Sequence, residues 1–269
     1  MTTATATATP PTRVGRLVLV LVLWKSFFFL AAANYQRMQN VGFATCMLPA
    51  LRRLYRGAEL RAAVERHLEF FNSHPYMACA VLGAAVRMEE DIAAGTASPE
   101  RVRAFKRTMM GPLAALGDGF FWTSLKPFGA AWAIYGVLYD QLWAPVAFLV
   151  LYNALHLGVR IFGIFRGYRV AEQVFIDLNR MRLTRLSDWA HIVTGAALGL
   201  IAARQAELAR MGGLALGDGL EPFLLGTLIM ISLLCLKRQL PMLALLYVFA
   251  GGCILFVVGL QAIFPILGS

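Results

Sequence analysis

The chain has 269 residues, of which 59% are hydrophobic and only 15% are charged. A soluble domain carries about a quarter charged residues, so this composition excludes an ordinary water-facing surface and favours one that faces lipid. The net charge of +10 comes from short basic groups beside apolar runs, which is typical of cytoplasmic loops in membrane proteins, and no base-stacking module or basic tail indicates nucleic-acid binding.

The N-terminal segment combines a polar tail with an apolar run. Residues 1–12 are low in complexity and rich in threonine, which predicts a disordered tail before a single membrane domain over residues 13–269. The apolar run Leu17–Ala33 contains Lys25 and Ser26. It resembles a secretory signal, but these two polar residues and the motif that follows favour a retained amphipathic helix at the cytoplasmic membrane face.

The next segments alternate between amphipathic and apolar patterns. Residues 50–71 predict an amphipathic helix whose apolar face shifts partway, so we expect a kink or break at Gly57. The apolar run Tyr76–Met88 is shorter than the roughly 20 residues of a span and predicts a re-entrant or bundle-buried segment. Residues 98–100, Ser-Pro-Glu, have the residue types of a helix cap and first turn.

Residues 109–127 are mostly apolar but carry three sets of helix-breaking residues, Gly-Pro, Gly-Asp-Gly and Lys-Pro. At membrane depth, backbone groups freed by such breakers are tolerated only where protein or a polar cavity surrounds them. Broken helices of this kind often mark the binding region of transporters. The segment is therefore the predicted centre of a transport site.

Five apolar stretches are candidate membrane spans. Two glycine pairs with GxxxG spacing, at residues 163–167 and 195–199, would allow close helix contact. The predicted fold is an all-α integral membrane protein with multiple transmembrane helices, re-entrant or broken helices, and an N-terminal amphipathic helix. The candidate spans are Phe128–Tyr139, Leu142–Phe165, Trp189–Ala203, Phe223–Leu236 and Pro241–Pro265.

The sequence shows no self-contained active site. It contains no phosphate-binding loop, zinc-protease or serine-hydrolase motif, and its four cysteines lie far apart. We therefore predict no catalytic residue, no metal site and no cofactor. A lone membrane histidine more often makes a helix-to-helix hydrogen bond than relays protons. The histidines are His67, His74, His156 and His191.

Polar residues within the apolar segments are better candidates for ligand contact. An uncharged, hydroxyl-rich ligand needs converging donors and acceptors, with an aromatic face against its CH groups. The alternative is that the same polar groups pair with one another and cap turns. The candidate binding residues are Asn34, Gln36, Arg37, Asn72, His74, Asp118, Trp122 and Lys126.

Three stretches, in this order, resemble one family. They are NYQRMQNVGF at residues 34–43, HLEFFNSHPY at 67–76 and MGPLAALGDGFFW at 110–122. With RIFGIFRGY at 160–168, they are similar to the IID component of the mannose/fructose/sorbose-type phosphotransferase system. The resemblance covers most of residues 25–269.

This resemblance implies a non-enzymatic, multi-pass subunit of the bacterial inner membrane, in contact with membrane lipid. Such a subunit pairs with a IIC subunit, the pairs assemble as a trimer, and a mannose-type hexose passes through. A soluble IIB protein, charged through IIA, then phosphorylates the sugar. One departure, Gln36 where the family usually has an acidic residue, motivates the alternative of a IID-like interaction or sensing protein without active sugar uptake.

Overall fold

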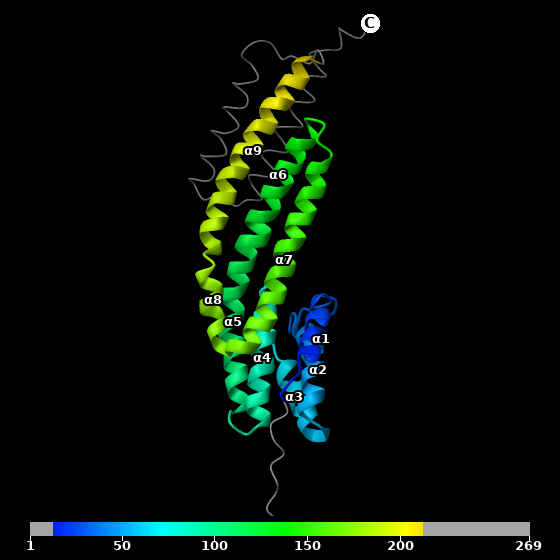
Figure 1. Ribbon diagram of the computed structural model, residues 1–269, viewed down its shortest axis with the longest axis vertical. Coiled ribbons are helices and arrows are strands. Elements are labelled where there is room, and N and C mark those ends of the chain that lie inside the picture. The colour runs from blue at the N-terminus through cyan, green and yellow to red at the C-terminus, as the bar shows by residue number, and fades with distance from the viewer. Residues whose placement is uncertain (1–12, 212–269) are drawn as a thin grey trace, which may run out of the picture. The chain divides into compact units, whose positions relative to one another are not determined.

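The computed structural model describes residues 13–211, and this part of the chain is helical without any named strand. The chain divides into two compact units at residues 201 and 202, and the arrangement described here is that of the first unit (Figure 1). The predicted tail and the last two predicted spans lie outside the described residues. The helices are α1 (Arg16–Ser26), α2 (Asn40–Leu54), α3 (Gly57–His67), α4 (Ala78–Ala93), α5 (Pro99–Gly117), the π-helix η1 (Asp118–Leu125), α6 (Lys126–Val137), α7 (Trp143–Val170), the 3₁₀-helix η2 (Ala171–Gln173), α8 (Val174–Arg180) and α9 (Leu183–Met211).

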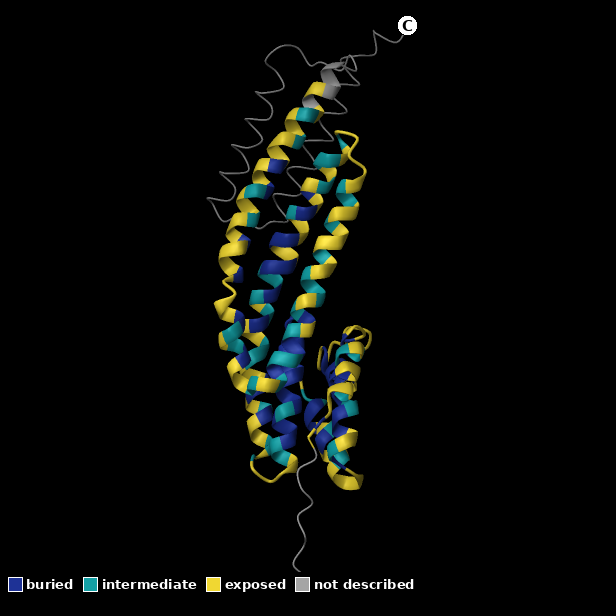
Figure 2. Cartoon of the chain, in the orientation of Figure 1, coloured by how far each residue is buried: buried dark blue, intermediate teal, exposed yellow. Residues whose placement is uncertain are grey.

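Helix α4 forms the centre of the core. Small and apolar residues make up most of it, and it is buried along most of its length, as the dark blue ribbon in Figure 2 shows. The predicted Tyr76–Met88 segment is thus bundle-buried rather than re-entrant. Burial on all sides suits the part of the helix over Ala78–Val86, which is apolar around its whole circumference.

Glycines bring α4 and α7 into close contact. A Cβ atom on Gly163 would lie 2.9 Å from the Ala80 nitrogen, and one on Gly167 would lie 2.5 Å from the Ala80 oxygen. The first GxxxG pair therefore packs as predicted, because only glycine lets the two backbones approach this closely. The second pair, Gly195 and Gly199, has no neighbour within 4 Å of its Cβ positions among residues 13–211.

Two predicted helix boundaries are confirmed. Helix α2 ends at Leu54 and α3 begins at Gly57, whose φ of +53° is readily adopted only by glycine among common residues. Helix α5 begins at Pro99, with an extended Ser98 before it. Proline suits this first position because its missing N–H has no helical partner there.

The predicted break over residues 109–127 is wrong in its form. Helices α5, η1 and α6 follow one another without interruption, and the irregularity is the π-helix (Figure 1). Within it, the Lys126 N–H donates to the Phe121 carbonyl, five residues back. A π segment accommodates an extra residue in a continuing helix, so the Gly-Pro and Gly-Asp-Gly sequences do not end it.

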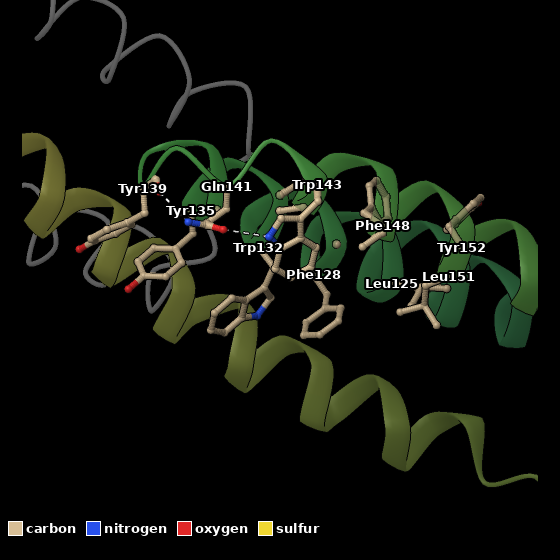
Figure 3. A pocket seen from close by; sticks show the side chains of 15 residues that line it. Leu125, Phe128, Trp132, Tyr135, Tyr139, Gln141, Trp143, Phe148, Leu151 and Tyr152 are labelled. Carbon is tan, nitrogen blue, oxygen red and sulfur yellow. Dashed lines mark hydrogen bonds between the residues drawn. The ribbon is translucent and has the colours of Figure 1, made fainter.

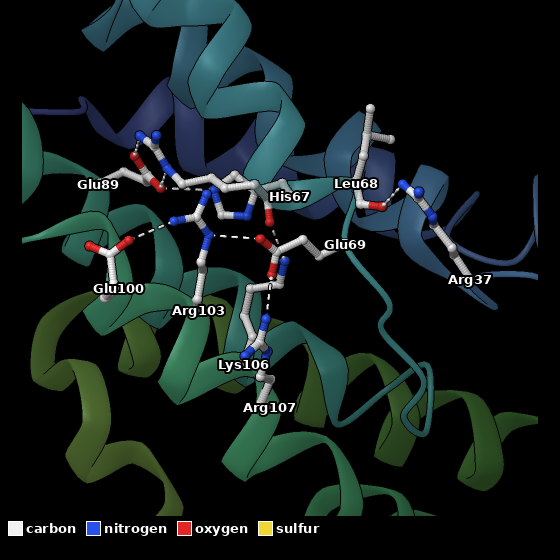
Figure 4. A network of polar contacts seen from close by, with 10 residues as sticks. Arg37, His67, Leu68, Glu69, Glu89, Glu100, Arg103, Lys106 and Arg107 are labelled. Atoms are coloured by element: carbon white, nitrogen blue, oxygen red, sulfur yellow. Dashed lines mark hydrogen bonds and ion pairs between the residues drawn. The ribbon is translucent and has the colours of Figure 1, made fainter.

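A buried carboxylate joins α2, α3 and α4 (Figure 4). Glu89 accepts hydrogen bonds from Arg66 at 2.6 and 2.7 Å, from His67 at 2.9 Å and from the Tyr55 hydroxyl at 2.8 Å. Burial alone would raise the pKa of Glu89, but the Arg66 and His67 contacts outweigh it and lower the pKa to about 2. Burial lowers the pKa of His67 to about 4, so the imidazole is neutral near pH 7.

Helix α1 is attached to the bundle at both ends. The buried Arg160 of α7 donates to the Ser26 carbonyl at 2.7 Å and to its hydroxyl at 3.0 Å, so a cation stands at the carbonyl end of α1, where the helix dipole is negative. The Tyr168 hydroxyl donates to the Val14 carbonyl at 3.2 Å. Apolar residues lie on both the buried and the exposed sides of α1, as Val22 and Leu17 illustrate, and its amphipathic, interfacial character stays a prediction.

One stretch of the described residues, Trp143–Gln205, is long and apolar enough to cross a membrane by length and composition. It is not one straight helix, because Ala171 and Arg182 have positive φ angles of 49° and 50°. These two residues separate α7, α8 and α9. The predicted number of spans stays a prediction.

Candidate functional site

The predicted binding residues fall into two groups in the structure. The first group, Asn34, Gln36, Arg37 and Asn72, is exposed on the loops around α2. The Asn34 amide donates to Asn40 at 2.9 Å, and its carbonyl oxygen accepts the Arg37 backbone N–H at 2.8 Å. Asn34 therefore closes a turn, which is the capping role that the sequence left open.

Arg37 has a similar structural contact. Its guanidinium donates to the Leu68 carbonyl at 3.4 Å, across to the segment that follows α3. Among residues 13–211, no hydrogen bond or ring contact joins the first group to Trp122 or Lys126. Placing both groups in one binding site therefore stays a prediction.

The second group comes together around η1. The His74 and Trp122 rings lie 4.9 Å apart between centroids, and the Lys126 ammonium lies 5.6 Å from the centre of the Trp122 ring. This distance allows a cation–π contact. The structure thus brings His74 together with Trp122 and Lys126, which lie about 50 residues further along the chain.

Asp118, Trp122 and Lys126 form a stripe along η1 and the start of α6, at a spacing of four residues. In an α-helix, a step of four overshoots one turn by about 40°. A π turn takes more residues, so in η1 residues four apart lie more nearly above one another. Trp122 and Lys126 are exposed, Asp118 is half-buried, and neither charged group has an ion pair within the part of the chain that the structure describes.

His74 lies behind this stripe and is only 1% exposed. Its Nδ1 accepts the Tyr76 backbone N–H at 3.4 Å, so in the neutral ring Nε2 carries the hydrogen. That Nε2 is buried without a hydrogen-bond partner among the described residues. A Cβ on Gly117 would overlap the His74 ring, which gives a packing reason for the glycine beside Asp118.

Aromatic residues that the sequence analysis missed surround His74. Phe121 stacks on the His74 ring at 5.3 Å, Tyr76 stacks on His156 at 4.7 Å, and the Tyr76 and Tyr152 hydroxyls lie 3.2 Å apart. Their signal in the sequence was weak, because single aromatics in an apolar helix usually belong to the core. Only the fold shows that they converge.

A cavity of about 390 Å³ lies between α6 and α7 (Figure 3). Its lining is almost entirely apolar and aromatic, for example Phe128, Trp132 and Leu151, with Gln141 near one end. A sugar needs several polar partners, so this cavity suits hydrocarbon better than a hexose. Leu125 and Tyr152 line the end of the cavity that lies beside the residues around η1.

The chain resembles proteins of one family along most of its length. The sequence profile described as "PTS system mannose/fructose/sorbose family IID component" matches residues 15–261. The mannose-specific EIID component of Escherichia coli K12 is 34% identical over 175 residues, which is 64% of this chain and 62% of that protein, less than two thirds of its length. The fructose permease IID component of Bacillus subtilis is 31% identical over 182 residues, 67% of this chain and 66% of that protein.

Two solved structures have the same fold. One is the cryo-EM structure of the mannose transporter ManYZ in complex with microcin E492, with a TM-score of 0.56 and 26% identity over 95% of this chain and 99% of that one. The other, described as a membrane protein, has a TM-score of 0.71 and 26% identity over 93% and 98%. The chain therefore belongs to the mannose/fructose/sorbose family of phosphotransferase-system IID components, which are membrane subunits of sugar permeases.

Proposed function

We propose that this chain forms, with a IIC subunit, the sugar translocation unit of a mannose-type phosphotransferase system, in which IIB carries out phosphoryl transfer to the sugar. The main observation in support of this proposal is the stripe of Asp118, Trp122 and Lys126, whose charged ends have no ion pair within residues 13–211. The similar structure of ManYZ, described as a mannose transporter, supports the pairing with a IIC subunit and a hexose as the substrate.

The position of the stripe along the helices supports a role inside the membrane. Four aromatic residues, Trp132, Tyr135, Tyr139 and Trp143, gather near the α6–α7 turn (Figure 3), and such aromatic belts lie at membrane interfaces. Lys126 precedes Tyr139 by 13 residues, or about 20 Å at 1.5 Å per residue. In a hydrocarbon core of about 30 Å, Lys126 would lie inside the bilayer, and Asp118, eight residues earlier, would lie near the opposite boundary.

The residues of the stripe match the chemistry of a hexose. A carboxylate accepts hydrogen bonds from sugar hydroxyls, an ammonium donates to them, and an indole face packs against the CH groups of the ring. The free Nε2–H of His74 is a further donor behind Trp122. The open side of the stripe leaves room for a IIC subunit to supply the other half of the pocket.

Exposed apolar residues give the chain surface for lipid and for further subunits. Trp143, Val146 and Val150 are exposed on α7, and Trp189 and Ile192 are exposed on α9. Apolar patches of this extent are unusual on soluble monomers. They support a multi-pass subunit in the bacterial inner membrane. In our proposal the IIC/IID pairs assemble as a trimer, and IIB, charged through IIA, transfers its phosphoryl group to the sugar.

The test uses the complex with the IIC subunit encoded beside this chain. Asp118→Asn removes the charge without changing the side-chain size, and we expect sugar uptake to fall at least about tenfold at unchanged complex yield. Asp140→Asn is the matched control, because Asp140 is exposed in the α6–α7 turn with a φ of 58° that asparagine also accepts. Normal uptake in the Asp118 variant, or a wild-type chain that associates with no IIC subunit, would contradict the proposal.

A further inference from the structure

The π-helix η1 is contacted by a histidine from a distant helix. His191 of α9 places its Nε2 atom 3.0 Å from the Ser124 hydroxyl and 3.2 Å from the Thr123 carbonyl. A carbonyl oxygen only accepts hydrogen bonds, so Nε2 carries the hydrogen and donates it. His191 thus makes the helix-to-helix hydrogen bond that the sequence favoured for a lone membrane histidine.

The Thr123 carbonyl is available to His191 because of Pro127. In an α-helix the N–H of residue 127 would bond the carbonyl of residue 123, and proline has no N–H. Inside a bilayer a carbonyl without a donor costs several kcal/mol. An imidazole from α9 therefore replaces the backbone donor that the Lys-Pro sequence removed.

Two hydroxyls in η1 bridge the wide turn. The Thr123 hydroxyl donates to the Asp118 carbonyl at 2.7 Å, and the Ser124 hydroxyl donates to the Gly119 carbonyl at 2.6 Å. Both bonds reach five residues back, which is the spacing of a π-helix. His191 holds the second of these hydroxyls, so it contacts both the π turn and its C-terminal end.

We propose that His191 is a positioning residue for the stripe: it holds η1 in the π register and so sets the rotation and spacing between Asp118, Trp122 and Lys126. A change of the segment to the α register would rotate everything after η1 relative to everything before it, because the extra residue would have to be taken up elsewhere. Asp118 lies at the start of η1 and Lys126 directly after its end, so this change would alter the distance and angle between their side chains. The inference rests on the proposed function of the stripe.

Spin labels on either side of η1 measure whether this segment is in the π or the α register. In the full chain, in complex with IIC and with its four cysteines replaced, Asp118→Cys and Lys126→Cys carry one label each. The two positions are about 9 Å apart along the axis of a π-helix and about 12 Å apart in the α register, both within the range of dipolar broadening in continuous-wave electron paramagnetic resonance. We expect broadening with His191 and with His191→Gln, whose side-chain amide keeps a donor, and weaker broadening with His191→Leu.

Ser124→Ala removes the hydroxyl that contacts His191 and bonds the Gly119 carbonyl, and it leaves the contact of His191 with the Thr123 carbonyl. It should weaken the broadening in the same direction as His191→Leu, but by less. If the leucine variant does not give a monodisperse complex, the serine variant gives the answer instead. Unchanged broadening in the variant that is measured overturns the inference.

Transport by the otherwise unaltered chain separates this inference from the proposed function. A helix-to-helix hydrogen bond of about 0.6 to 1.7 kcal/mol corresponds to a factor of about 3 to 17, so we expect His191→Leu to raise the KM for sugar by about this factor. His191→Gln should restore it. A wild-type complex without uptake contradicts the proposed function, whereas normal uptake with unchanged KM in the leucine variant contradicts the role of His191 alone.

Discussion

Single residues of the site are distinguished by the hydrogen-bond and ion-pair partners that they lack among residues 13–211. Within this range Asp118 and Lys126 have no ion pair, and the buried Nε2 of His74 has no hydrogen-bond acceptor. Ionised and polar groups at membrane depth are costly unless they are used. In contrast, the buried Arg160 donates to Ser26, so its role is to hold α1 and not to bind a ligand.

Trp122 allows a test of the aromatic face of the site. Its ring lies between His74 and Lys126 and is 44% exposed. We expect Trp122→Phe to keep most of the sugar affinity and Trp122→Ala to lose about tenfold, since a stacking face is worth on the order of 1 kcal/mol. Isothermal titration of the IIC complex with sugar measures this. Equal affinity in the two variants would show that the ring does not contact the ligand.

At the scale of helices, glycines on both sides form a close seam between α4 and α7. Gly163 and Gly167 lie against the backbone of α4 at Ala80, and Gly83 of α4 lies against the Ile164 carbonyl in return. Backbone atoms cannot move aside as a flexible side chain can. The seam therefore fixes how α7, and with it Tyr152 and His156, stands beside the site.

Two substitutions within α7 test this seam. Gly167→Ala should destabilise the protein by about 1–3 kcal/mol, because its new Cβ would lie 2.5 Å from the Ala80 oxygen. Gly158→Ala is the matched control: nothing lies within 4 Å of its Cβ position, so it should stabilise the helix by up to about 1 kcal/mol. Thermal unfolding of the two variants in detergent compares them. A Gly167→Ala variant as stable as Gly158→Ala would refute the seam.

At the scale of the described bundle, the Glu89 network links three helices through one buried charge. Glu89 has a folded-state pKa lowered from 4.5 to about 2, and His67 has one lowered from 6.5 to about 4. For both groups the unfolded chain binds protons at a higher pH than the folded chain does. Stability is therefore fully present above about pH 6.5 and is lost as the pH falls, first through His67 and then, below about pH 4.5, through Glu89.

His67→Gln tests the upper part of this pH window. The amide keeps a donor toward Glu89 but cannot be protonated in this range. Between pH 6.5 and 4.5 we expect the wild-type midpoint of thermal unfolding to fall by about 3 °C more than that of the variant. Differential scanning fluorimetry in detergent, at fixed salt, measures both profiles. Parallel profiles would exclude His67 as the titrating group.

The sequence by itself determined the family, the buried character of α4, the break at Gly57 and the start of α5 at Pro99. These features depend on interactions between near neighbours: the hydrophobic period, the φ preference of glycine and the missing N–H of proline. They can be read from the chain because each needs only a few consecutive residues. His74, Trp122 and Lys126 were also named from the sequence, although their contact was not.

Only the tertiary structure decided how residues 109–127 continue as a helix, because the donor for the freed Thr123 carbonyl comes from His191, 68 residues away. It also decided between two glycine pairs of identical spacing. Gly163 and Gly167 meet the backbone of α4, while Gly195 and Gly199 meet nothing within 4 Å in the part of the chain that the structure describes. The physical reason is the same in both cases: the partner atom belongs to a distant helix, and its position depends on the packing of the whole bundle.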